Sequence, residues 1–391
     1  AARAEQARTY SPGSLRPETA RALYGAELHF SSSRIDVLAG CRFAHFLQYG
    51  LRAQEREPAE FDSRFYGTFV HDVLEHVVQQ TEREGGFAAV PRSRVQELAQ
   101  ERMEQNAQTL LETFPDSGRT GYLLRRTFDE VTQVVDELYD ELSVSAFRPE
   151  FCELEFSARG ALPGVAFAGE HCRGVVEGFV DRVDVWQSGG RPYVRVVDYK
   201  TGRKSFDYTN VLHGRGLQML LYLFALVRLG GHLLHGEPLP AGVLYFPARI
   251  ERVSVRDRLA QAEIEKERRK QLRRSGVLLN SDPVLEAMEP CGGSPRFLPY
   301  TLDKEGRKTG DLASFAQLAQ LERFVFRTVA ALGDELADGR IDPDPCIRDA
   351  KDSACAFCPY SEVCAGHEQP RWLKKITAEE FWQTLERREH G

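Results

Sequence analysis

The sequence predicts a mixed α/β fold in which a central mixed β-sheet is flanked by helices. Through most of 31–150, apolar residues recur at spacings of three and four, the period of amphipathic helices. Between 151 and 200 the pattern changes to alternating segments rich in β-branched residues, which predicts strands. A nearly all-apolar stretch at 214–230 then predicts a buried helix. With 391 residues, 42% of them hydrophobic, the chain is long enough for one large core or two to three smaller ones.

These patterns divide the chain into five expected segments. They are a lead-in at 1–30, a helical region at 31–150, the sheet core and its helix at 151–250, a charged insertion with a helix at 251–340, and a cysteine-rich tail at 341–391. The lead-in should contain one short helix near "RPETARALYG". Strands are expected at "FCELEFSARG", "RGVVEGFVDRVDVWQ", "YVRVVDYK" and "AGVLYFPARI".

The insertion contains a basic cluster within "RDRLAQAEIEKERRKQLRRSG", which predicts a helix or a flexible arm. Two roles stay open for this cluster. It can be the solvated face of a helix, or it can contact DNA.

Composition limits the classes of function. The net charge of −7 means that the field of the whole chain repels a polyanion, so any nucleic-acid binding must be local. No run of about 18 uncharged apolar residues occurs, and we expect no membrane insertion and an intracellular location. The sequence contains no Gly-x-x-x-x-Gly-Lys-Ser/Thr phosphate loop, so it encodes no ATP-driven motor of that type. Because it opens without methionine, we expect a fragment of a longer protein.

Two acids and a lysine lie near a predicted hairpin. The turn "SGGR" at 188–191 joins the two long strands, and a symmetric turn places Asp181 directly opposite Asp198. Like charges in such a cross-strand pair are destabilising, so a cation should lie between them. Lys200 shares the face of Asp198 because strand side chains alternate.

This arrangement predicts a site for a hard divalent cation. Mg²⁺ takes oxygen ligands, often from one or two carboxylates, and keeps several waters for a phosphate substrate. The lysine could position or help to activate an attacking water. Asp184 lies on the opposite pleat from Asp181, so strand parity favours Asp181, while Glu177 is a helper acid or a solvated one. The alternative for Asp181, Asp198 and Lys200 is that they form an exposed, salt-bridged strand end without a metal.

The motifs "GFVDRV" and "VVDYKTG" resemble the paired-acid and Asp-x-Lys motifs of the RecB-like branch of the PD-(D/E)XK nucleases, so we expect their restriction-endonuclease-like core. Upstream, "GTFVHDVLE" is similar to the branch's helix with a metal-binding histidine, here His71. Downstream, "QMLLY" is similar to its glutamine and tyrosine, here Gln218 and Tyr222. From the residues alone, the alternatives are a core histidine at His71 and a buried amide bonded to backbone at Gln218.

The resemblance also implies a mechanism of DNA cleavage that depends on Mg²⁺ or Mn²⁺. It implies that the metal is held by His71, Asp181, Asp198 and the carbonyl of Tyr199. It further implies that Lys200 orients the water, and that Gln218 and Tyr222 position DNA or support the site.

Three cysteines in "CAFCPYSEVC" are spaced as Cys-x2-Cys-x5-Cys, which indicates a metal centre. These residues, Cys355, Cys358 and Cys364, require a fourth ligand, and Cys41 and Cys346 are the candidates. Spacing alone does not choose between zinc and an iron–sulfur cluster.

The segment "SSSRIDVLAGCRFAHFLQYGL" resembles the start of the nuclease domain of AddB, one component of the AddAB helicase–nucleases. This resemblance implies a [4Fe–4S] cluster held by Cys41, Cys355, Cys358 and Cys364 that staples the two ends of the domain. It also implies a single-stranded DNA substrate, an AddA-like helicase as partner, a helicase-like region preceding this chain, and the bacterial cytoplasm. The alternatives are a stand-alone RecB-like or CRISPR-adaptation nuclease, and a non-catalytic iron–sulfur scaffold that binds DNA or a partner.

Overall fold

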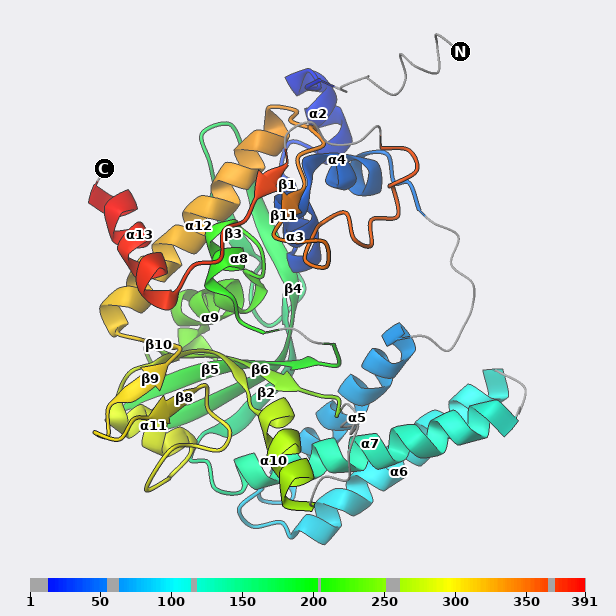
Figure 1. The fold of residues 1–391 in the computed structure, drawn as a ribbon, viewed down its shortest axis with the longest axis vertical. Helices are drawn as coiled ribbons and strands as arrows, with labels where there is room; N and C mark the ends of the chain where they lie inside the picture. The colour runs from blue at the N-terminus through cyan, green and yellow to red at the C-terminus, as the bar shows by residue number, and fades with distance from the viewer. Residues whose placement is uncertain are drawn as a thin grey trace.

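The computed structural model describes residues 13–54, 63–113, 118–202, 205–250, 261–364 and 370–390. A sheet occupies the centre, and helices lie on both of its sides (Figure 1). The predicted mixed α/β class is confirmed.

The N-terminal part is helical, as the apolar spacing predicts, and the lead-in contains its one expected short helix. Two of the long helices, α6 and α7, form a hairpin that extends away from the sheet (Figure 1). The helices of this part are α2 (Pro17–Tyr24), α3 (Ser32–Gly40), α4 (Arg42–His45), α5 (Ser63–Arg83), α6 (Arg92–Thr113) and α7 (Gly118–Leu142), with a π-helical turn η1 (Phe46–Gly50).

The central sheet has eight strands in the order β1-β4-β5-β6-β7-β10, with β2 and β3 also pairing with β4. Four of them match the predicted strands, and β1, β3, β7 and β10 were not predicted. The strands are β1 (Leu28–Ser31), β2 (Arg148–Phe156), β3 (Val165–Ala168), β4 (Arg173–Ser188), β5 (Arg191–Lys200), β6 (Leu239–Pro247), β7 (Ser275–Leu279) and β10 (Leu312–Ala313).

The hairpin of β4 and β5 fixes the register on which the site depends. Gly189 and Gly190 both have positive φ, 58° and 76°, as a two-residue turn of type I′ requires. Ser188 therefore pairs with Arg191, and the antiparallel pairing continues to Arg182 opposite Val197. The symmetric closure of the turn predicted from the sequence is confirmed.

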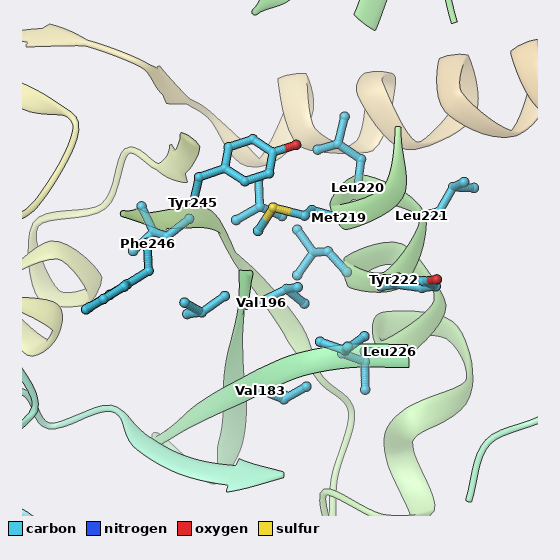
Figure 2. Packing of buried hydrophobic residues seen from close by; sticks show 14 of the residues in the cluster. Val183, Val196, Met219, Leu220, Leu221, Tyr222, Leu226, Tyr245 and Phe246 are labelled. Atoms are coloured by element: carbon cyan, nitrogen blue, oxygen red, sulfur yellow. The ribbon is translucent and has the colours of Figure 1, made fainter. Parts of the chain in front are cut away.

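Helix α9 (Gln218–Leu229) packs on one face of the sheet, as the nearly all-apolar sequence predicts. Figure 2 shows Met219 and Leu226 of this helix lying over Val183 of β4 and Val196 of β5. Burying a side chain of this size stabilises the fold by about 1.5–3 kcal/mol. The next helix of the same layer, α12 (Phe315–Ala337), begins with a capping box formed by Ser314 and Gln317.

The opposite face of β4 and β5 carries buried charges. Asp184 accepts hydrogen bonds from Arg182 at 2.8 Å and from Arg195 at 2.7 Å, and all three residues have no solvent exposure. Glu141 of α7 pairs with Arg195 at 3.0 Å and with Arg274 at 2.7 Å. Buried charges are tolerated only when they are paired in this way.

The charged insertion contributes a strand to the central sheet. Its basic stretch forms helix α10 (Gln261–Leu272), while its beginning, 251–260, lies outside the described residues. The chain then supplies β7 to the sheet. The other elements here are α8 (Tyr208–Leu212), the 3₁₀ turn η2 (Gly230–His232), α11 (Asp282–Met288), β8 (Tyr300–Leu302) and β9 (Lys308–Gly310).

The C-terminal tail returns to the N-terminal helices. It contains β11 (Cys346–Ile347), β12 (Arg371–Trp372) and α13 (Ala378–His390). The backbone N–H of Arg42 donates to Asp344 at 3.1 Å, and Arg371 donates to the carbonyl of Ala39 at 2.6 Å. Segments 302 positions apart in the chain are thus directly bonded.

Among the described residues, no helix combines the length and hydrophobicity that crossing a bilayer requires.

Candidate active site

The two facing acids lie near the end of the β4–β5 hairpin, on the face that α9 covers. The regular pairing ends with Arg182 opposite Val197, and the next residues along the two strands are Asp181 and Asp198. Asp181 accepts a hydrogen bond from the backbone N–H of Tyr199 at 2.7 Å. Asp198 is only 5% exposed. The two acids are therefore neighbours across the hairpin and largely buried, and Asp198 is close enough to raise the pKa of Asp181, although its carboxylate is outside the set of ligand atoms within 4.8 Å formed by His71, Glu153 and Asp181.

Lys200 contacts the carboxylate of Asp198 through its ammonium group and is about one-quarter exposed. Both side chains leave the same face of β5 because they are two residues apart. A charged lysine thus stands between the buried acids and solvent.

Helix α5 brings His71 to the same place. Its Nε2 donates to the carbonyl of Tyr199 at 2.8 Å, and its Nδ1 lies 3.5 Å from the Asp181 carboxylate. Gly67 of the same helix lies against Thr201, where a Cβ would make an ordinary van der Waals contact at 3.5 Å. His71 is therefore not an isolated core histidine.

Glu153 is a third acid of the site that sequence reasoning missed. Ligand atoms of His71, Glu153 and Asp181 lie within 4.8 Å of one another, and no other set of three His, Cys, Asp or Glu residues is this close in the described parts of the chain. Glu153 occupies the position of β2 across from Asp181, between two regularly paired residues. Its φ of 49° is in the left-handed region, which is strained for a glutamate.

Burial and mutual repulsion disturb the protonation of these acids. Burial, followed by the neighbouring Asp198, raises the pKa of Asp181 to about 6. Burial, followed by Asp181, raises the pKa of Glu153 to about 7. Both carboxylates are thus harder to ionise than normal, and a cation between them would remove this penalty.

The N-terminal part of α9 carries Gln218 and Tyr222 toward the acids. Tyr222 is buried, its ring stacks on Phe156 at 5.2 Å, and its hydroxyl bonds to Ser32 and Gln218. Gly178 of β4 makes room for it, because a Cβ at that position would lie 2.0 Å from the Tyr222 hydroxyl oxygen. The pair forms a polar wall beside the acids.

Two other acids of β4 are not part of this group. Asp184 lies on the opposite face with its arginine partners, as strand parity predicts. The carboxylate of Glu177 lies 3.3 Å from Nδ1 of His29.

Four cysteines line a second, separate pocket of about 210 Å³ between the N-terminal helices and the tail: Cys41, Cys355, Cys358 and Cys364. Cys41 stands where α3 ends and α4 begins, with an extended backbone (φ −164°, ψ 122°). Cys346 does not line this pocket. It is fully buried, and its thiol donates to the carbonyl of Ala39 at 3.3 Å.

Comparison with known proteins also indicates a nuclease. The PD-(D/E)XK nuclease superfamily matches residues 29–365. The B subunit of the ATP-dependent helicase/deoxyribonuclease from Moorella thermoacetica is 34% identical, over 90% of this chain and 31% of its own length. Proteins of the same name from Thermoanaerobacter sp. (30% identical, 93% of this chain, 33% of the relative) and Oceanobacillus iheyensis (28%, 90%, 31%) are also similar.

The chain spans about a third of the length of these curated relatives. They confirm the predicted resemblance to the B subunit of a helicase–nuclease. Nucleases of the matching superfamily depend on a divalent metal, which agrees with the acids gathered here. By the match over most of its length, this chain belongs to the PD-(D/E)XK nuclease superfamily.

Proposed function

We propose that this chain is the nuclease domain of an AddAB-type helicase–nuclease, and that it hydrolyses phosphodiester bonds of single-stranded DNA during the processing of double-strand breaks. The observation that carries the proposal is the row of Glu153, Asp181 and Asp198 across three neighbouring strands, with Lys200 beside it. The proposal includes an AddA-like helicase as partner, a helicase-like region that belongs to the same polypeptide as this domain, and the bacterial cytoplasm. Similarity to the B subunits of helicase/deoxyribonucleases supports it.

The donor set fits Mg²⁺ or Mn²⁺. These ions take carboxylate and carbonyl oxygens, and Mg²⁺ keeps waters on its remaining positions. The residues that would hold the ion are His71, Asp181, Asp198 and the carbonyl of Tyr199, with Glu153 as a further acid. When bound, the ion would stabilise charge on the scissile phosphate and on the leaving oxygen. The raised pKa values of Asp181 and Glu153 support a site that needs positive charge.

Lys200 would orient the attacking water. Its ammonium group has three N–H donors, and the contact with Asp198 leaves donors for a water and for a phosphate oxygen. Gln218 and Tyr222 would support the acids and guide the DNA strand, because their side chains bond to each other beside the site.

The four-cysteine pocket fits a [4Fe–4S] cluster. All four thiols predicted as ligands line one cavity, whereas Cys346 is bonded elsewhere. Thiolate ligands suit zinc as well as an iron–sulfur cluster. The resemblance of the segment around Cys41 to AddB supports the cluster. When bound, it would link the N-terminal helices to the tail and so restrain the unfolded chain.

Delivery by a complex is part of the proposal. The net charge of −7 opposes capture of free DNA, so a motor protein that feeds the strand into the site would compensate for weak binding. The stand-alone nuclease alternative lacks this compensation.

A cleavage assay tests the proposal. The parent protein with Mg²⁺ should degrade single-stranded DNA, and Lys200→Ala should lower the rate by at least about 100-fold, in the range expected for a catalytic group. Lys304→Ala, which removes an exposed lysine in the turn between β8 and β9, is the matched control and should cleave like the parent. Undiminished cleavage by Lys200→Ala would exclude this site. A parent that binds DNA without cutting it would favour the iron–sulfur scaffold.

A further inference from the structure

A polar pocket of about 410 Å³ adjoins the active site on the far side of Lys200. It lies at the ends of the parallel strands β5 and β6, where ligands of open α/β sheets commonly bind. Glu267 and Gln271 of helix α10, which lies near the end of β6 (Figure 1), line one side of it. Its size falls within the roughly 300–1,000 Å³ of small-ligand sites. One nucleotide is a ligand of that scale.

The charge of this pocket is opposite to that of the metal site. Lys200, Arg249 and Arg273 line it, whereas its one acid, Glu267, already accepts a hydrogen bond from Lys270 at 3.0 Å. Carboxylates thus lie on one side of Lys200 and guanidinium groups on the other. A DNA strand whose scissile phosphate lies at the acids would continue into a cationic pocket.

The guanidinium of Arg249 is positioned to bind a nucleotide. It is exposed, and its guanidinium lies over the ring of Tyr66 at 5.1 Å from the centroid. Stacking of this kind holds the planar group open to solvent, where it can bind a phosphate or stack on a base. Arg273 differs, because it donates to the backbone carbonyls of Leu298 and Tyr300 and therefore helps to shape the wall.

Gln271 of α10 adds a side-chain amide that can form a hydrogen bond with the edge of a base. The residue lines the pocket, and its buried side-chain oxygen has no hydrogen-bond partner within the described chain. A buried acceptor without a donor is costly. The amino group of cytosine or adenine is a donor that would satisfy it.

We propose that this pocket binds the nucleotide next to the scissile phosphate of a single DNA strand, with Arg249 on its phosphate or base and Gln271 on the base edge. The inference rests on the proposed nuclease function and names the substrate contact of the same site. A pocket that accepts one nucleotide with its base turned inward selects an unpaired strand over a duplex.

Binding measured without cleavage tests the phosphate contact. Fluorescence anisotropy with a short labelled oligodeoxycytidylate, in EDTA and at several low salt concentrations, should show five- to tenfold weaker binding by Arg249→Ala. The slope of log affinity against log salt should fall by about 0.7, the value for one phosphate contact on a single strand. Arg249→Lys should keep the parent's slope because it keeps the charge. Arg307→Ala, an exposed arginine outside the pocket, is the control and should bind like the parent.

An abasic oligonucleotide of equal length tests the base contact. The parent should bind it several-fold more weakly than the cytidylate, and Gln271→Ala should reduce that difference. Parent-like affinity and slope in Arg249→Ala, equal loss in Arg307→Ala, or equal binding of both oligonucleotides by the parent would each overturn the proposal. If the parent binds as expected but never cleaves, the nuclease proposal fails and the pocket is a binding site for single-stranded DNA without a catalytic role. If the parent cleaves DNA but Arg249→Ala binds with the parent's affinity and salt slope, only the subsite proposal fails.

Discussion

One chemical change made at two neighbouring positions of β4 should have opposite effects. Asp181 and Asp184 are three residues apart and lie on opposite faces of the sheet. Replacing each by asparagine removes a negative charge and keeps the shape of the side chain. We expect Asp181→Asn to stabilise the metal-free protein and weaken metal binding, and Asp184→Asn to do neither.

The cost at Asp184 follows from its partners. Arg182 and Arg195 are fully buried, and both donate to this carboxylate. Breaking a buried ion pair by removing one partner destabilises a protein by about 3–5 kcal/mol. Asparagine still offers one acceptor oxygen, so we expect a loss near the lower end of that range.

The gain at Asp181 follows from its pKa. Burial and the nearby Asp198 raise this pKa from 3.8 to about 6, and one pKa unit corresponds to about 1.36 kcal/mol. Because the pKa is higher in the folded state, the native protein binds protons more readily, and stability falls as pH rises from 3.8 through about 6. Above that range the ionised carboxylate costs roughly 2–3 kcal/mol. The neutral amide avoids this cost.

Thermal unfolding in EDTA at mildly alkaline pH, followed by calorimetric titration with Mn²⁺ well below the melting temperature, measures both effects. Asp181→Asn should melt higher than the parent and bind Mn²⁺ at least tenfold more weakly. Asp184→Asn should melt lower and, while folded, bind Mn²⁺ like the parent. A lower melting temperature for Asp181→Asn, or unchanged Mn²⁺ affinity, would refute the shared-cation reasoning. Loss of Mn²⁺ binding in folded Asp184→Asn would show that the wrong face was assigned.

The remaining predictions concern three other parts of the molecule. Glu153→Gln should weaken Mn²⁺ binding several-fold in the same calorimetry, and unchanged affinity would remove this acid from the site. Anaerobically purified parent and Cys346→Ser should be brown with broad visible absorption, whereas Cys41→Ser should lose the colour; a colourless parent with stoichiometric zinc would contradict the cluster. Burial lowers the pKa of His45 to about 3, so the neutral ring stabilises the fold above about pH 6.5 and that stability is lost as pH falls. Between pH 7 and 5.5 the parent should lose about 1 kcal/mol more than His45→Gln, measured by urea unfolding, and equal losses would refute this.

The sequence predicts the positions of Asp181 and Asp198 because one short turn fixes the register of their two strands. Two glycines between β4 and β5 allow a single compact closure, and that closure sets Asp181 beside Asp198. Glu153 could not be found in this way. The chain between β2 and β4 is long and includes β3, so no register can be counted from it, and the left-handed backbone at Glu153 breaks the alternation that strand reasoning uses.

The strand missed in the insertion has a different cause. β7 is five residues long and follows directly on the charged helix α10. When hydropathy is averaged along the sequence, the charged neighbours therefore mask its apolar residues. The burial of Arg182, Arg195 and Asp184 could not be predicted either, because hydropathy assigns such residues to the surface while mutual pairing lets them be buried. Pairing across the sheet and from α7 is tertiary information that no local pattern contains.

The direct bonding of Arg42 to Asp344 has a consequence for synthesis on the ribosome. The carboxylates that pair with Arg42, those of Glu335 and Asp344, are added about 300 residues later. At roughly 5–20 residues per second, the arginine is made some 15–60 s before its partners. During that interval the N-terminal helices hold an unneutralised cation and an open thiol at Cys41. Nascent chains halted before Glu335 should therefore be the forms that chaperones and proteases capture first.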